Sequence, residues 1–175
     1  VLGVGSRLLP ALLGHTNTPD QGTKPTRDGI KIFIATAILY VASFGLDSFV
    51  DLRLGAWLRL AIYAFVVLKY WKLMKIPAKK TVASFALWSS GWMVLFGVGA
   101  AALTKTYYVH FMHIAFVGGF GLMSFIVATR VILAHGGHSM KIEVDSKLLA
   151  ATSIGIVLAS LTRAFAILIP STYRS

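Results

Sequence analysis

Long stretches without charged residues are the feature that most constrains the fold of this chain. Five apolar runs are long enough to cross a bilayer: Ile32–Val50, Leu54–Tyr70, Val82–Leu103, Tyr107–Ala134 and Leu148–Ile169. A membrane-spanning helix needs roughly 20 apolar residues, because the hydrocarbon core of a bilayer is about 30 Å thick. The runs therefore predict an all-α fold, a polytopic transmembrane helix bundle that forms one domain over residues 1–175.

Two of the apolar segments are weaker than the others. Arg59 interrupts the second run, and Val1–Leu13 is an apolar stretch broken by Pro10. The sequence thus predicts about five full spans plus a partial sixth. Because the first segment resembles the end of an earlier helix, we expect the chain to be a fragment, the C-terminal half of a longer protein.

The composition excludes several classes of protein. Hydrophobic residues make up 57% of the chain and charged residues 13%, whereas soluble domains carry about 25% charge. The net charge of +11 could indicate nucleic-acid binding, but the charges lie in short links between apolar runs, so no nucleic-acid partner is expected. The chain has no cysteine, which excludes disulfides, iron–sulfur ligation and covalent haem attachment.

The basic residues predict how the helices are oriented. Lysines crowd the link after the second run, at Lys69, Lys72, Lys75, Lys79 and Lys80. Links rich in Lys and Arg stay on the cytoplasmic side. We therefore expect Gly14–Lys31, Trp71–Thr81 and His135–Lys147 to face inward in a bacterial inner membrane, with the C-terminus in the periplasm.

The fourth run carries most of the histidines. Four of the five lie on or beside it, namely His110, His113, His135 and His138. At about 100° per residue, one face of this helix collects His110, His113, Val117, Gly121, Ser124, Ala128 and His135. Neutral imidazole is a common ligand of metals and of haem iron, and small residues let a flat macrocycle approach closely. His113 and His135 are separated by ~33 Å along the helix axis, so they cannot share one metal.

Each of these features also has a plain structural explanation. Glycines in membrane helices allow tight helix packing, and histidines at helix ends can be interfacial residues. His113 should lie inside the hydrocarbon boundary, where ionisable groups are costly and usually functional. The pattern alone leaves a haem or metal site and simple helix packing as alternatives.

Other polar residues lie at matching depths. Thr36, Tyr40, Ser43 and Asp47 form a stripe on the first full helix. Asp47 could orient an imidazole, or it could pair with Arg53 or Arg59. Arg59 needs an anion, which a haem propionate, Asp47 or Asp51 would supply.

Arg130 lies near the inner end of the fourth run. It could reach lipid phosphate, which is the default for an arginine there.

The segment from His113 to His138 resembles a motif of the NnrS family, in which a histidine precedes a glycine-rich turn, a methionine, Arg-Val and a closing Gly-His. The matching residues are His113, Gly118, Gly121, Met123, Arg130, Val131, His135 and Gly137. The start of the chain, from Gly3 through Arg7 to Pro10, is similar to the family's Gly…Arg-x-x-Pro. The sequence departs from the motif at Ala134, Gly136 and His138, which puts a standard role for the inner end in doubt.

The resemblance implies a bacterial inner-membrane protein of about a dozen helices that contains haem and copper and is linked to nitric oxide metabolism or nitrosative stress. It implies haem b and copper as cofactors, and the missing N-terminal half or other membrane subunits as partners beside the lipid bilayer and nitric oxide. Ligand candidates are His110, His113, His135 and His138. Gly118 and Gly121 would give the macrocycle clearance, and Arg59 and Arg130 would meet propionates.

Two other classes stay open. A metal-free transporter or channel would use Asp47, Arg59 and the histidines as a polar pathway. A structural or electron-transfer subunit of a respiratory complex would need none of them as ligands. Whether the chain is an enzyme is left undecided.

Overall fold

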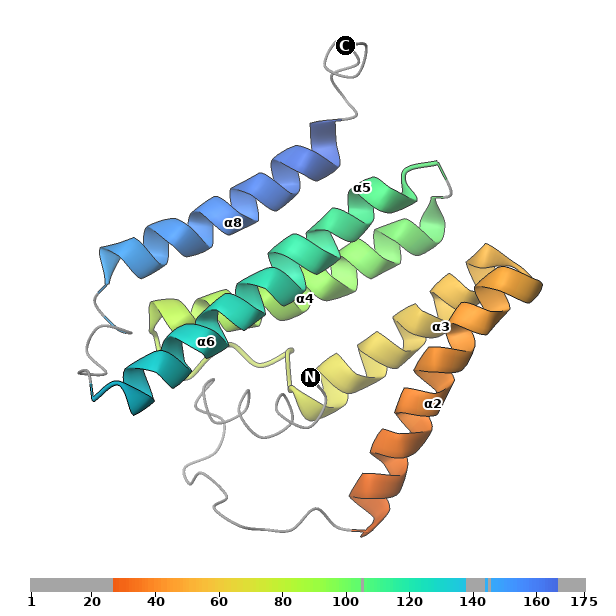
Figure 1. Ribbon diagram of the computed structural model, residues 1–175, viewed down its shortest axis with the longest axis horizontal. Coiled ribbons are helices and arrows are strands. Elements are labelled where there is room, and N and C mark those ends of the chain that lie inside the picture. The colour runs from red at the N-terminus through yellow and green to blue at the C-terminus, as the bar shows by residue number, and fades with distance from the viewer. Residues whose placement is uncertain (1–26, 105, 138–143, 145, 167–175) are drawn as a thin grey trace.

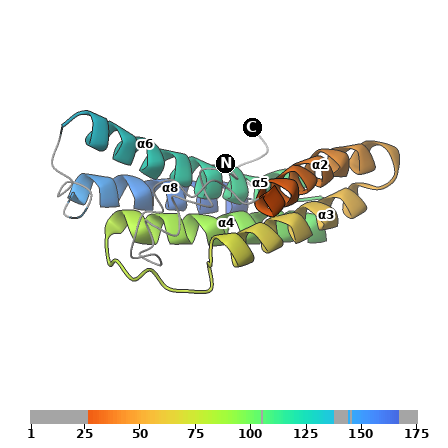
Figure 2. The same cartoon turned by 90° about the horizontal axis from the view of Figure 1, so that it is seen from below.

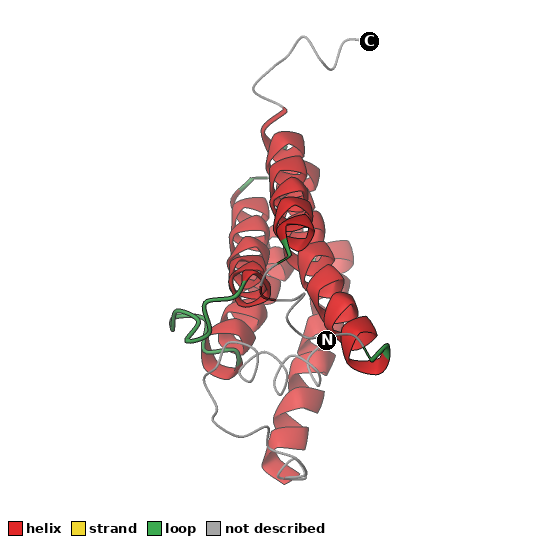
Figure 3. Ribbon diagram, turned by 90° about the vertical axis from the view of Figure 1, so that its left-hand side faces the viewer, coloured by secondary structure: helices red, strands yellow, loops and turns green. Residues whose placement is uncertain are grey.

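The described part of the chain is helical throughout. We analysed a computed structural model of the chain that describes residues 27–104, 106–137, 144 and 146–166. Figure 3 shows helices and connecting loops, and no strand, among these residues. The helices are α2 (Arg27–Phe49), α3 (Leu52–Phe65), η1 (Val66–Tyr70), α4 (Val82–Leu103), α5 (Tyr108–His113), η2 (Ile114–Gly121), α6 (Leu122–His135) and α8 (Lys147–Phe165).

Four helices are long and apolar enough to cross a membrane. They are Ile30–Phe49, Val82–Leu103, Tyr108–His135 and Lys147–Phe165. The expected count of five spans plus a partial sixth is therefore not confirmed. The predicted run Leu54–Tyr70 is helical, but α3 has only 14 residues before it widens into the π-helical η1, and it carries Arg53 and Arg59. The predicted partial helix Val1–Leu13 lies outside the described residues.

Helix α4 is the centre of the bundle. It packs against α3, α5, η2, α6 and α8, whereas α2 makes its main contacts with α3 among the described helices. Figure 1 shows α2 leaning away from the others, and Figure 2 shows α3 and α4 in one layer with α2 and the α5–α6 helix in another. Many large apolar side chains of α2 are exposed, as expected for a surface that contacts lipid or another membrane segment.

A buried apolar cluster lies where η1, α4, α6 and α8 meet. Its largest fully buried members include Leu87, Leu122 and Ile126. The loop after η1 joins this cluster, because Trp71 and Leu73 are buried and the Trp88 indole N–H donates to the Leu73 carbonyl over 2.9 Å. The basic loop is therefore anchored to α4 at two of its residues.

The histidine-bearing helix is continuous but changes pitch. Residues 114–121 form a π-helix, in which the Leu122 N–H reaches the Val117 carbonyl, five residues back. Because such a helix turns more slowly per residue than an α-helix, residues spaced by four stay aligned. The buried stripe Ile114, Gly118, Leu122 and Ile126 has this spacing.

Candidate functional site

A buried ion pair ties α2 to α3 near the turn that joins them. Arg59 is only 4% exposed, and its Nη1 lies 2.6 Å from Asp47 Oδ2. The guanidinium also lies 4.8 Å from the centre of the Phe44 ring and 3.5 Å from the Ser43 carbonyl oxygen. The sequence left two roles open for Asp47, orienting an imidazole or pairing with an arginine. The structure shows Asp47 paired with Arg59.

The pair is possible because α2 and α3 approach closely. A Cβ built on Gly55 would collide with the Asp47 carboxylate, so only glycine leaves room for it there. After these contacts, Arg59 Nη2 is buried without a hydrogen-bond partner among the described residues. A buried donor without a partner is costly, so an acceptor from a ligand would be favoured at this atom.

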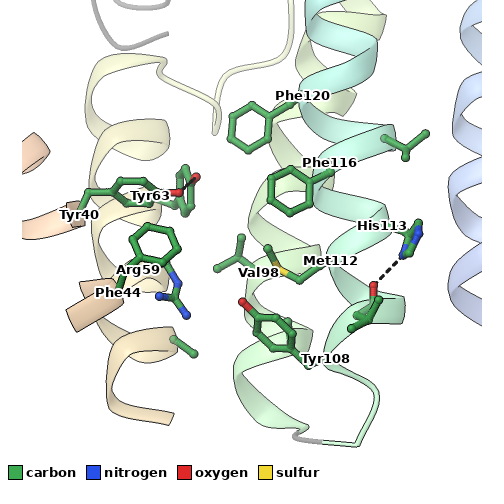
Figure 4. A pocket seen from close by; sticks show the side chains of 14 residues that line it. Tyr40, Phe44, Arg59, Tyr63, Val98, Tyr108, Met112, His113, Phe116 and Phe120 are labelled. Atoms are coloured by element: carbon green, nitrogen blue, oxygen red, sulfur yellow. Dashed lines mark hydrogen bonds between the residues drawn. The ribbon is translucent and has the colours of Figure 1, made fainter. Parts of the chain in front are cut away.

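Arg59 lines a cavity of about 440 Å³ between α3 and the α5–η2 helix. Its walls are mostly aromatic and apolar, with Tyr108, Met112, Phe116 and Phe120 on one side. Figure 4 shows Arg59 and Tyr108 at the space between the two helices, and Tyr63 above Arg59. The volume lies within the usual range of ligand pockets, roughly 300–1,000 Å³. An apolar cavity with one buried cationic group suits a flat, apolar ligand that carries an acceptor.

His113 lies at the rim of the same cavity. Its Nδ1 is 2.7 Å from the Val109 carbonyl oxygen, and in Figure 4 the ring lies on the side of its helix away from Arg59. A carbonyl oxygen can only accept, so Nδ1 carries a proton, and in the neutral imidazole Nε2 then has the lone pair. A backbone carbonyl on Nδ1 is a common way to prepare Nε2 as a metal ligand.

The other histidines are distributed as follows. His135 is exposed at the end of α6, with its Nδ1 3.0 Å from the Val131 carbonyl oxygen, so its Nε2 is prepared in the same way. His110 is half-buried one turn before His113. His138 lies outside the described residues. Within the described segments, no three His, Cys, Asp or Glu side chains gather as a metal site would require.

The face predicted from the helical projection is the uncovered side of the helix. The projection assumed one α-helical pitch throughout. The predicted face is nevertheless exposed at Val117, Gly121, Ser124, Ala128 and His135. The slower turn at residues 114–121 keeps His113, Val117 and Gly121 in line, since they also recur every fourth residue.

The two predicted clearance glycines differ in surroundings. A Cβ on Gly118 would meet Met93 and Ser160, so this glycine lets α4 and α8 pack against η2. A Cβ on Gly121 would meet only the helix's own Phe116 carbonyl, at 3.3 Å, so the space outside it is open. Clearance for a ligand is thus available at Gly121, whereas the space at Gly118 is already filled by protein.

Arg130 is half-buried on α6 and does not line the cavity. The structure brings His113 and Arg59 to one cavity and keeps Arg130 and His135 apart from it.

The sequence did not indicate that three tyrosines, Tyr40, Tyr63 and Tyr108, line one cavity. The Tyr40 and Tyr63 hydroxyls lie 3.0 Å apart and join α2 to α3. Tyr40 belonged to the predicted polar stripe, but Tyr63 and Tyr108 lie in segments where aromatic residues are common. The spacing of Tyr108, Met112 and Phe116 by four was the available signal.

Comparison with known proteins identifies a family. A model of a family described as NnrS protein matches residues 1–175. No curated protein and no solved structure matches the chain.

Proposed function

The chain belongs to the NnrS family, and from that premise we propose that it binds haem b, with copper as a second metal, and serves nitric oxide metabolism or resistance to nitrosative stress. The proposal places it in a bacterial inner membrane with a periplasmic C-terminus, beside further membrane segments that complete the site. Four apolar helices of spanning length support a multi-pass membrane protein.

The observation that carries the proposal is that His113 and Arg59 border one apolar cavity. His113 offers Nε2 as a ligand, because its Nδ1 is engaged by a carbonyl. Arg59 offers Nη2 to a propionate, because Nη1 is taken by Asp47. The aromatic walls would exclude water from a macrocycle. These residues fit haem in donor type, charge and polarity, although the His113 ring lies on the side of its helix away from Arg59.

Haem, when bound, supplies an iron that can carry an electron or bind a small gas such as nitric oxide. The protein's part is to hold and orient. The Val109 carbonyl would keep the His113 imidazole in one tautomer, and Asp47 would hold Arg59 in place.

Copper would be held separately at either end of the helix, because the two ends are too far apart to share one metal. His110 stands beside His113, and His135 stands at the other end with its Nε2 prepared in the same way. Copper favours imidazole ligands. We propose these histidines as the copper ligands together with His138, which lies outside the described residues, and Arg130 as a propionate partner.

An optical spectrum and a metal analysis of the purified protein test the proposal. We expect a Soret band that His113→Ala reduces severalfold and that added imidazole restores. His135→Ala is the matched control, since it removes the same side chain and the same carbonyl contact outside the cavity. It should leave the cavity haem unchanged and lower only the metal bound at its own end.

The absence of a Soret band and of copper would exclude the proposal. Flux of a substrate across liposomes, lost in Asp47→Asn and indifferent to haem, would instead favour the metal-free transporter. An unchanged spectrum in His113→Ala, with cytochromes co-purifying, would favour the respiratory subunit.

A further inference from the structure

A second cavity lies on the opposite side of α4 from Arg59, between α4 and α8. It has a volume of about 580 Å³ and is lined by apolar side chains of both helices, with the fully buried Leu122 among the lining residues. Phe85, Ile154 and Leu158 border it and are 43%, 58% and 57% exposed. The cavity is therefore a groove open along the side of the bundle, where acyl chains of the bilayer would lie.

One end of this groove is cationic. Lys80 lines it directly, and Lys79 precedes Lys80 in the chain. Both lysines are exposed, and neither makes an ion pair within the described segments. Lys147, the first residue of α8, is also exposed. Charged groups at the end of a groove between membrane helices are typical of sites for anionic lipid headgroups.

The position of Lys80 is fixed by the loop before it. Leu73 is fully buried, and a Cβ on Gly91 would meet its Cδ1 at 2.8 Å, so the loop packs tightly on α4. Downstream, Thr81 caps α4 by accepting a hydrogen bond from the Ser84 N–H over 3.2 Å. The residue after Lys80 is therefore held at the start of α4, and Lys80 stays beside the groove.

We propose that this groove binds one anionic phospholipid, with an acyl chain along Phe85, Ile154 and Leu158 and its phosphate at Lys80. Charge complementarity selects the anionic class, because a zwitterionic lipid would offer the same chain but no net charge to the lysines. This lysine-rich loop is predicted to lie on the cytoplasmic side. Anionic lipids are found in the cytoplasmic leaflet, where they attract basic residues. The proposal does not depend on haem.

Retention of lipid through purification provides the first test. The full chain would be equilibrated in mild detergent with phosphatidylglycerol or phosphatidylcholine of identical chains, and bound lipid counted by native mass spectrometry. We expect phosphatidylglycerol to be retained at least fivefold over phosphatidylcholine. Lys80→Gln should reduce this retention about fivefold, the usual effect of one lysine near a charged lipid surface, and Lys80→Arg should preserve it.

Lys75→Gln is the matched control. Lys75 is an exposed lysine of the same loop that does not line the groove, so its removal should change retention less than twofold. Equal losses in Lys75→Gln and Lys80→Gln would overturn the proposal in favour of diffuse attraction. Equal retention of the two lipids, or a co-purified protein segment in the groove, would also overturn it.

Fluorescence quenching provides a readout of position. Trp88 lines the groove, so brominated phosphatidylglycerol should quench its emission. The Trp88 emission is the part of the tryptophan fluorescence that is lost in Trp88→Phe. Quenching should fall in Lys80→Gln and stay in Lys75→Gln. Lack of Trp88 quenching in the parent protein would refute the assigned groove.

Discussion

Removing the charge of Asp47 should loosen α2 from the bundle. Asp47→Asn keeps the shape that fits against Gly55 but leaves the Arg59 guanidinium, 4% exposed, without its anion. The remaining contact to the Ser43 carbonyl, at 3.5 Å, is long, and the Phe44 ring contributes about 2 kcal/mol at such a desolvated site, less than the buried anion that is lost.

The expected cost follows from these contacts. Breaking a buried ion pair by removing one partner costs about 3–5 kcal/mol. We expect Asp47→Asn to lower the free energy of unfolding by about 3 kcal/mol, which is roughly a hundredfold in the unfolding constant. The double variant Asp47→Asn with Arg59→Met should recover about 2 kcal/mol, because no charge is then left unpaired.

Unfolding in mixed micelles, followed by tryptophan fluorescence and circular dichroism, would measure these differences. Hydrogen exchange should speed up over α2 more than over α4, since α2 packs mainly on α3 among the described helices. Ser48→Ala is the control, because Ser48 is an exposed neighbour whose hydroxyl bonds only its own helix at Phe44. A loss below about 1 kcal/mol in Asp47→Asn, or no gain in the double variant, would refute this account of the pair.

Three further substitutions test the packing by the same unfolding assay. Gly97→Ala should cost about 2 kcal/mol, because its Cβ would lie 2.5 Å from the Ala115 backbone nitrogen and force α4 from the facing helix; a neutral result would contradict that contact. Gly155→Ala should instead stabilise by ~0.5–1 kcal/mol, since nothing lies within 4 Å and α8 gains helix propensity; a loss would mean that something covers this face. Tyr63→Phe should cost about 1 kcal/mol by removing the hydroxyl contact with Tyr40, and an unchanged midpoint would show that this hydrogen bond adds nothing.

The membrane helices could be predicted well from the sequence where their ends carry local signals. Helix α4 has the predicted bounds Val82–Leu103, because Thr81 caps its start and the apolar run stops at Thr104. The second run is not confirmed as a span, because its α-helical part, Leu52–Phe65, has only 14 residues before it widens into η1. Hydropathy thus locates a helix more reliably than it shows whether that helix crosses the bilayer.

The site was only partly predictable. Arg59 had three candidate anions in the sequence, and the choice of Asp47 depends on Gly55, whose small size matters only once α2 and α3 pack. The Tyr40–Tyr63 contact joins residues 23 positions apart, so no local spacing indicates it. Gly118 and Gly121 look alike in the motif, yet one is covered by α4 and α8 and the other is open.

The wide turns at residues 114–121 have a consequence for the length of this helix. An α-helix advances about 100° per residue, and the wide turns advance somewhat less, so deleting one residue without a change of pitch would swing everything after it by nearly that angle. Leu122 and Ile126, fully buried in the cluster shared with α4 and α8, would then turn out of it, and His135 would face a different direction. The number of residues between His113 and His135 is thus tied to the pitch of residues 114–121, and a single-residue deletion here keeps the core packing only if the wide turns rewind into α-helical ones.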